Sequence, residues 1–228
     1  MSIYFRKMES SPPQTPFAPS WRYFLGDSWI NGVDFNRLSK FILDKENEII
    51  NSYPPSDNKY SVDGYTGLGN KSLTSRFGSY NLLKFDTIDI RQLRKEISRV
   101  HKEFIDALGV VNSERIWIQC WANVLRDGEE IKPHLHGVNP YIYLGGHITV
   151  QCNDSSTVYI NPINQINDPE TISILNEVGK ITLFQNNIPH YTTPHRGVKE
   201  RISIAFDMVY DNQPISKSNM ILLDLDEI

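Results

Sequence analysis

Apolar side chains recur at steps of three and four in two stretches of the N-terminal half, which is the spacing of an amphipathic helix. The first stretch lies between Asp34 and Asn51. The second runs from Ile90 to Leu108, and Gly109 follows it at a position where glycine commonly ends a helix. We therefore predict two helices, each with one apolar face that must pack against another layer.

From residue 115 onward the helical period gives way to the alternation of β-strands. Segments 115–125 and 200–210 each carry apolar residues on one face and mainly polar residues on the other. Further strands are expected in 21–30, 140–152, 156–162 and 179–187. A barrel or sandwich satisfies this pattern if the helices cover its apolar face and its polar face lines a ligand cavity.

The length of 228 residues and the 39% hydrophobic content fit one globular domain, which we place at residues 21–228. Residues 1–20 are rich in Ser and Pro and predict a flexible arm. Within the domain, residues 21–114 would provide helical support and 115–210 the β core. The stretch 53–83 has no regular period, and a loop this long in a compact domain is usually functional or disordered.

Charge and cysteine content narrow the class of protein. The net charge of −4 argues against a broad nucleic-acid-binding surface, which needs an excess of Lys and Arg. Apolar runs stay well short of the roughly 18 residues that cross a membrane, and the N-terminus lacks the apolar core of a signal peptide. Cys120 and Cys152 both lie in strand-like segments and predict two buried thiols rather than a disulfide scaffold. We expect a cytoplasmic protein without a membrane partner.

Three of the six histidines have a spacing that suits a metal site. His134 and His136 form an H-x-H, and alternate residues of an extended segment point the same way. His190 follows 54 residues later, at the end of a predicted strand. Imidazoles on a rigid scaffold suit iron, zinc or copper. An H-x-H alone is a weak signal, and a surface feature remains the alternative.

Arg201 and Ser203 share one face of the strand that follows His190. The fork of an arginine can bind a carboxylate through two parallel hydrogen bonds, and a neighbouring hydroxyl can donate a third. The alternative is a surface ion pair between Arg201 and an acid such as Glu200. Two further residues could contact the same ligand: Asn123, and Tyr143 if its face of the strand points inward.

The motifs in combination resemble the 2-oxoglutarate/iron(II) oxygenase superfamily. They are W-x-N at 121–123, G-x5-H-x-H at 128–136, G-x-I-x-L-F-x5-H at 179–190 and R-I-S-I-x-F at 201–206. Within the superfamily the pattern is similar to a group of bacterial and phage proteins distantly akin to prolyl hydroxylases. The resemblance covers about residues 115–210.

The resemblance implies a mainly β fold with flanking helices: a double-stranded β-helix, or jelly-roll and cupin-like, barrel with the N-terminal helices packed on the major sheet. It implies an oxygenase that couples 2-oxoglutarate decarboxylation to hydroxylation of a substrate, using Fe(II), 2-oxoglutarate and O2. His134 and His190 would bind iron, and Arg201 with Ser203 would bind the far carboxylate of 2-oxoglutarate. The 53–83 loop, with Tyr60, Tyr65, Arg76 and Tyr80, would then close over the substrate as a lid.

His136 departs from the superfamily, in which an Asp or Glu commonly stands at this position. His136 could be a third ligand, could turn away, or could mark a barrel that has lost catalysis. A cupin-type dioxygenase with three histidines and no 2-oxoglutarate is one rival hypothesis, although it gives Arg201 and Ser203 no role. A non-catalytic metal- or ligand-binding barrel is the other. The substrate could be a small molecule or a peptide side chain, and a nucleobase is the least favoured class.

The remaining histidines are expected to play no part in the site. His101 lies on the second predicted helix and is expected at its surface. His147 is expected to face solvent from its strand, and His195 to lie in a solvated turn.

Overall fold

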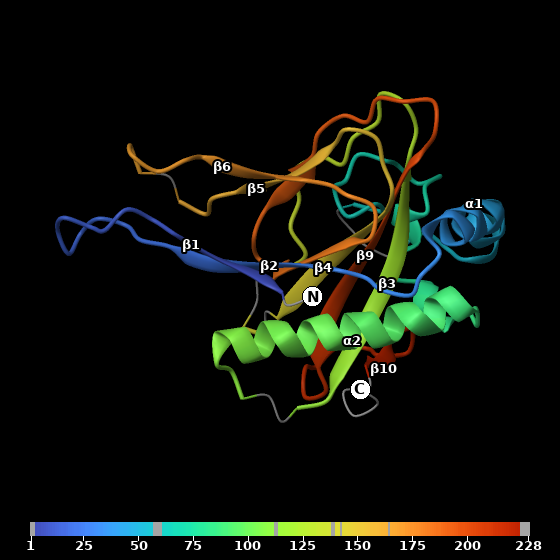
Figure 1. Ribbon diagram of the computed structural model, residues 1–228, viewed down its shortest axis with the longest axis horizontal. Coiled ribbons are helices and arrows are strands. Elements are labelled where there is room, and N and C mark those ends of the chain that lie inside the picture. The colour runs from blue at the N-terminus through green and yellow to red at the C-terminus, as the bar shows by residue number, and fades with distance from the viewer. Residues whose placement is uncertain are drawn as a thin grey trace.

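The computed structural model describes residues 3–56, 61–111, 114–137, 140–141, 143–163 and 165–223. Its strands form a seven-stranded sheet and a three-stranded sheet, with antiparallel pairing throughout (Figure 1). The large sheet contains, in spatial order, β1 (Tyr4–Glu9), β2 (Arg22–Trp29), β7 (Lys180–Gln185), β4 (Leu144–Gln151), β9 (Arg201–Tyr210), β3 (Ile116–Leu125) and β10 (Ile221–Leu223). The small sheet contains β6 (Thr171–Leu175), β5 (Ser156–Ile160) and β8 (His190–Thr192).

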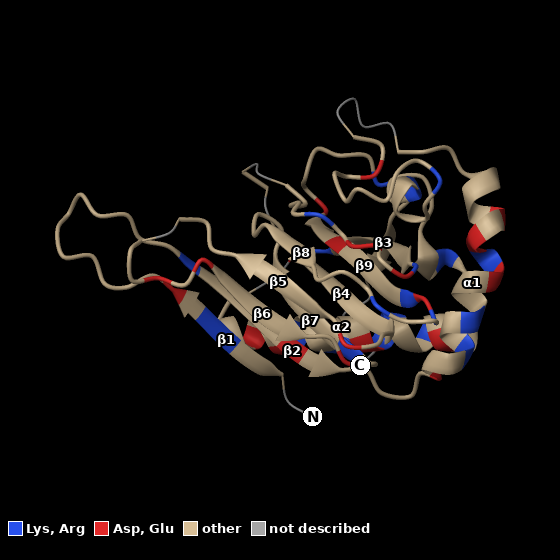
Figure 2. Cartoon of the chain, turned by 90° about the horizontal axis from the view of Figure 1, so that it is seen from above, with Lys and Arg blue, Asp and Glu red and all other residues tan. Residues whose placement is uncertain are grey.

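The two sheets face each other across a small apolar cluster. Tyr23 and Leu25 of β2 and Phe184 of β7 pack there against Tyr159 of β5 and Ile174 of β6. In Figure 2 the strands of the small sheet lie over those of the large one. Two facing antiparallel sheets with helices outside them confirm the predicted mainly β barrel.

Two helices cover the outer face of the large sheet (Figure 1). Helix α1 (Phe35–Ser52) begins after Asp34, whose side chain accepts a hydrogen bond from the Arg37 amide. Helix α2 (Ile88–Leu108) ends at Gly109, which adopts a φ of 66° that few other residues tolerate. Both helices therefore form where the apolar periodicity predicted them.

The predicted alternation of β9 is confirmed by what each face contacts. Ile202, Ile204, Phe206 and Met208 are fully buried in the core that the sheet shares with the helices. The opposite face, which begins with Arg201, looks into the barrel toward the small sheet. Burial of apolar surface stabilises a fold by about 25 cal/mol per Å², and the helix-facing side chains of β9 supply such burial. The inner face of β9 can therefore carry polar groups.

The N-terminal segment differs from the flexible arm that was expected, because residues 4–9 form β1 and pair with β2. Arg6 donates to the buried carboxylate of Asp27 on β2 at 2.9 Å. The ring of Phe5 stacks on Phe24, with 5.4 Å between centroids. The charged residues within YFRKME break the apolar alternation that would have predicted a strand. The strand forms because β2 provides partners for these residues.

The loop at 53–83 is folded over one end of the barrel in its described parts, 53–56 and 61–83. It contains two short 3₁₀ turns, η1 (Thr74–Arg76) and η2 (Leu82–Lys84). The carbonyl of Thr66 accepts a hydrogen bond from the Lys132 amide at 2.9 Å, which ties the loop to the segment that carries the H-x-H. In the described part of the chain, no helix combines the length and apolar character that crossing a bilayer requires.

Candidate metal centre and the barrel interior

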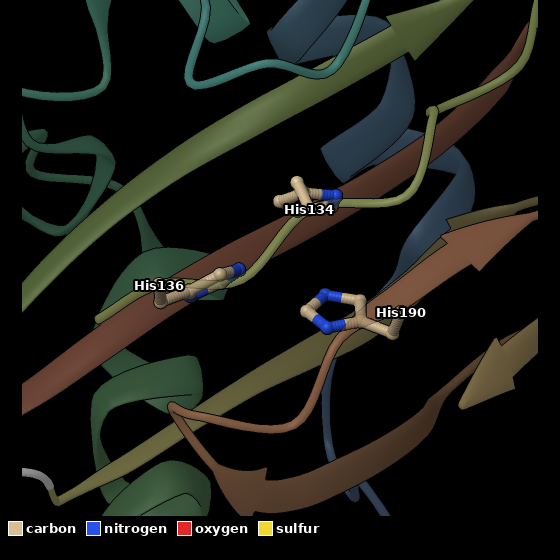
Figure 3. A group of neighbouring side chains, drawn as sticks. All are labelled: His134, His136 and His190. Carbon is tan, nitrogen blue, oxygen red and sulfur yellow. The ribbon is translucent and has the colours of Figure 1, made fainter. Parts of the chain in front are cut away.

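His134, His136 and His190 come together at the mouth of the barrel (Figure 3). Each offers one nitrogen, and these three atoms lie within 4.8 Å of one another. His190 starts β8, and His134 forms a β-bridge with it from the neighbouring extended segment. Because alternate side chains of an extended segment point the same way, His136 joins the other two while Leu135 does not.

One ring nitrogen of each histidine is already engaged. Nδ1 of His134 lies 2.9 Å from the Lys132 carbonyl, and Nδ1 of His190 lies 3.0 Å from the Ile188 carbonyl. Nδ1 of His136 lies 2.6 Å from Oδ1 of Asp207. A neutral imidazole that donates from Nδ1 keeps a lone pair on Nε2, so such contacts fix both the tautomer and the ring direction of a metal ligand.

Burial also favours the neutral, metal-binding form of two of these rings. Loss of solvent and, after it, the nearby His136 lower the pKa of His134 to about 4. Burial and then His134 hold the pKa of His190 well below its ordinary value. Three imidazoles grouped in this way fit a divalent transition metal and leave further coordination positions for other ligands.

Arg201 is buried in the barrel without an acidic partner among the described residues. Its Nε donates to the Ser155 hydroxyl at 3.2 Å, and with the Asn176 amide turned so that its oxygen accepts, Nη2 donates at 3.2 Å. Its Nη1 has no partner among the described residues. Burial lowers the pKa of Arg201 to about 10. A buried cation that is offered only neutral partners is costly, and a carboxylate ligand would relieve that cost.

Ser203 and Asn123 lie in one row across the barrel wall. In the sheet register Ser203 stands between Asn123 of β3 and Thr149 of β4. Asn123 is buried, and its Oδ1 accepts a hydrogen bond from the Thr74 hydroxyl at 2.6 Å. The carboxamide is thereby oriented by the loop, with its NH2 group left to donate elsewhere.

His147 also faces the interior, contrary to the expectation that it would face solvent. It pairs with Ala205 on the inner face of the sheet, and its Nε2 lies 3.0 Å from the Tyr159 hydroxyl. Burial, followed by the charge of Arg201, lowers the pKa of His147 to about 3. Alternation identifies the two faces of a strand but cannot say which of them is inner. His101 and His195, expected in solvent, are likewise buried.

Tyr143 lies away from the other predicted co-substrate residues. Its hydroxyl is 2.6 Å from Nε2 of His101 on α2, and its ring lies 4.3 Å from that of Tyr210. The prediction assumed that strand alternation extends through Tyr143, but β4 begins only at Leu144. Its side chain therefore turns toward the helix layer.

A cavity of about 220 Å³ opens beside the histidines and is partly roofed by the loop. Its lining includes Tyr65, Thr66, Trp121, Asn123, His134 and His136. Tyr65 lies at the rim with a φ of 66°, a backbone conformation that is strained for a side chain of this size. Tyr65 therefore borders this cavity, and its contact with substrate stays a prediction.

Arg76, the other predicted loop residue, points away from this cavity. Its guanidinium donates to the carbonyls of Ile50, Tyr53 and Asn70. The side chain thus holds the loop to the end of α1. Tyr60, also considered for the lid, lies outside the described residues.

A second cavity, of about 370 Å³, also borders His136. It is lined by amides of Gln119, Asn186 and Gln213 and by Asp207. The buried Oδ1 of Asn186 and Oε1 of Gln213 have no hydrogen-bond partner among the described residues. Neither cavity is lined by a Lys or Arg within the described part of the chain.

Three residues that the sequence did not single out lie at the site. Asp207 contacts His136, and Tyr159 contacts His147. A Cβ on Gly145 would lie 2.5 Å from Oδ1 of Asn186 and 3.3 Å from both Oδ1 of Asp207 and Nδ1 of His136. Asp207 had a usable signal, since it shares the inner face of β9 with Arg201. Gly145 and Tyr159 had none.

The fold and site together define a double-stranded β-helix with a three-histidine centre at its mouth. Residues 119–207 match the family described as "Putative 2OG-Fe(II) oxygenase". The matched segment contains the three histidines and Arg201. A search of curated proteins gave no match.

Several solved structures show the same fold. The Pseudomonas putida prolyl-4-hydroxylase superposes with a TM-score of 0.51 at 10% identity, covering 83% of this chain and 92% of its own. AviO1 from Streptomyces viridochromogenes Tue57 gives 0.54 at 12% identity, covering 84% and 92%. A Trichoplax adhaerens prolyl hydroxylase, in complex with a peptide of the hypoxia inducible factor oxygen degradation domain, gives 0.50 at 14% identity and covers 82% of each chain.

Proposed function

We propose that the protein is an iron(II) oxygenase that consumes 2-oxoglutarate and hydroxylates a polar substrate. The observation that carries the proposal is the buried Arg201, which has no acid among its described partners, in the same barrel as three converging histidines. An arginine held in this way is suited to a ligand that brings its own carboxylate.

His134, His136 and His190 would hold the metal through Nε2, and Arg201 with Ser203 would hold the far carboxylate of 2-oxoglutarate. When bound, iron with 2-oxoglutarate and O2 supplies the oxidising power. The chain's own contribution is to orient both partners and exclude water. Asn123, which lines the smaller cavity, and His147, which pairs with Ala205 on the inner face of the sheet, are candidates for further contacts with the co-substrate. A cytoplasmic location, expected from the sequence, would help to keep the iron ferrous.

The two cavities beside His136 would receive the substrate. Their amides, hydroxyls and aromatic rings, and the lack of Lys and Arg in their described linings, favour a neutral or cationic polar molecule over a phosphorylated one. The prolyl hydroxylases among the similar structures make a peptide one candidate class, and a small molecule of similar polarity is the other.

The test is an anaerobic titration of metal-free protein with ferrous iron and then 2-oxoglutarate, followed by visible absorption. We expect a weak charge-transfer band in the wild type that Arg201→Ala abolishes while iron binding persists. Arg196→Ala, which removes an exposed arginine from a nearby turn, is the matched control and should keep the band. A band that survives Arg201→Ala would refute this role of the arginine.

A cupin-type dioxygenase without 2-oxoglutarate is the second candidate, because all three donors of the cluster are histidines. In that case iron would bind, 2-oxoglutarate would produce no band, and Arg201→Ala would change neither result. Succinate formation from 2-oxoglutarate under air separates the two functions directly.

A further inference from the structure

The histidine cluster has no carboxylate among its grouped donor atoms in the described part of the chain. Three imidazoles leave the charge of a divalent cation uncompensated, and this charge would sit in a largely desolvated pocket. Such a charge is costly unless a negative group lies close to it. A source of negative charge near the cluster would therefore matter for metal binding.

We propose that Asp207 supplies this charge through His136, as a positioning residue one hydrogen bond behind the metal ligand. Nδ1 of His136 and Oδ1 of Asp207 are 2.6 Å apart. The His136 side chain is only 6% exposed and that of Asp207 23% exposed, so solvent screens the contact little. A carboxylate that accepts from Nδ1 fixes the tautomer and strengthens Nε2 as a donor.

His136 differs in this respect from the other two histidines. The Nδ1 atoms of His134 and His190 face backbone carbonyls, which carry only a dipole. Asp207 is the one acid that contacts a histidine of the cluster among the described ion pairs. Among the described ion pairs, negative charge therefore acts on the cluster only through the contact of Asp207 with His136.

The sheet is built to accommodate this pair. Asp207 lies opposite Gly145 of β4 and opposite Gln119 of β3 in the strand register. The missing side chain of Gly145 leaves room for Asp207 and His136, and the Asn186 carbonyl accepts from the His136 amide at 2.9 Å. Hydrogen bonds therefore hold both the backbone amide and the ring of His136.

The inference rests on the metal site of the proposed function, and its test measures metal affinity without turnover. Wild type, Asp207→Asn and Asp207→Ala are titrated anaerobically with Fe(II) against a chromophoric chelator, and the Co(II) forms are compared by visible spectroscopy. Asparagine can still accept the hydrogen bond but carries no charge. We expect both variants to lose affinity by about 10–100-fold, with shifted Co(II) bands. Wild-type affinity and spectrum in Asp207→Asn would overturn the proposal and leave Asp207 only an orienting role.

A double-mutant cycle with His136→Asp sharpens the test. That substitution puts a carboxylate directly into the cluster, so the charge of Asp207 becomes redundant there. We expect Asp207→Asn to cost no affinity in the His136→Asp background, and an equal loss in both backgrounds would contradict the inference. Asp211→Asn, which removes a carboxylate just beyond the end of β9 that pairs with Arg115, is the control and should match wild type.

The two proposals fail in different ways. If the Asp207 cycle behaves as expected but 2-oxoglutarate gives neither a band nor succinate, the oxygenase proposal falls and the role of Asp207 stands. If succinate forms but Asp207→Asn binds metal like wild type, only the role of Asp207 falls. Thermal unfolding of each metal-free variant shows that it is folded before metal is added.

Discussion

The backbones of His134 and His190 are joined by two hydrogen bonds. The amide of His134 donates to the carbonyl of His190 at 3.1 Å, and the amide of His190 donates back at 2.9 Å. Their ring centroids lie 4.5 Å apart. This bridge fixes two candidate ligands from segments 56 residues apart in sequence, so their separation depends on strand pairing rather than on flexible side chains.

Metal binding should stabilise the folded protein because the cluster exists only there. At a free metal concentration about a hundred times Kd, linkage predicts a gain of about 2.7 kcal/mol in the free energy of unfolding. Differential scanning calorimetry with Fe(II), and again with excess chelator, measures it as a reversible rise in Tm. In His190→Ala the rise should be lost, and an undiminished rise would show that metal binds elsewhere.

The adjacent glycines of β4 should respond differently to alanine. In Gly145→Ala the new Cβ meets Oδ1 of Asn186 and crowds His136, so we expect roughly tenfold weaker metal binding with little loss of stability. In Gly146→Ala the Cβ would lie 2.4 Å from the Phe206 ring and 2.8 Å from the Thr182 carbonyl. Overpacking there should cost about 1–3 kcal/mol while metal affinity is retained. Chelator competition and urea unfolding measure the two effects, and a reversed pattern would contradict the assignment of faces.

His101 should make stability depend on pH. Burial lowers its pKa to about 4 from an ordinary value near 6.5, so the folded state resists protonation. The free energy of unfolding is therefore unaffected by His101 above about pH 6.5 and falls as the pH drops from 6.5 toward 4. Below about pH 4 the loss is constant, at no more than about 3 kcal/mol. The difference in unfolding free energy between wild type and His101→Gln should therefore change across this window in urea titrations. A difference that is independent of pH would mean that His101 titrates normally.

Tyr65 should be replaceable by glycine without loss of stability. Its positive φ costs a non-glycine residue about 1 kcal/mol, and the side chain is 57% exposed, so little buried surface is lost. Tyr65→Gly should be at least as stable as wild type, whereas Tyr65→Ala keeps the strain and should be less stable than the glycine variant. Denaturant unfolding tests this order. If the ring contacts substrate, both variants should also turn over substrate more slowly while keeping the 2-oxoglutarate band.

The sequence by itself determined the elements whose pattern is local and repetitive. The 3.6-residue period within 34–51 and again within 90–108 indicated both helices. The alternation in 200–210 separated the apolar face of β9 from the face that carries Arg201 and Ser203. Strand geometry makes alternate residues share a side, which grouped His134 with His136, and the resemblance to the oxygenase superfamily added His190. These features depend either on residues that are close in sequence or on motifs that the oxygenase superfamily shares.

Only the tertiary structure decided which face of each strand is inner, and which distant groups meet. Strand alternation allows His147 to face either the solvent or the barrel interior. Packing of the small sheet places its side chain in the interior, next to Tyr159. Strand β1 exists because Asp27 and Phe24 of β2 provide partners for a charged segment. The contact between Asp207 and His136 joins residues 71 apart, and its site needs Gly145 from a third segment. Such contacts arise from the register of paired strands, which no local pattern encodes.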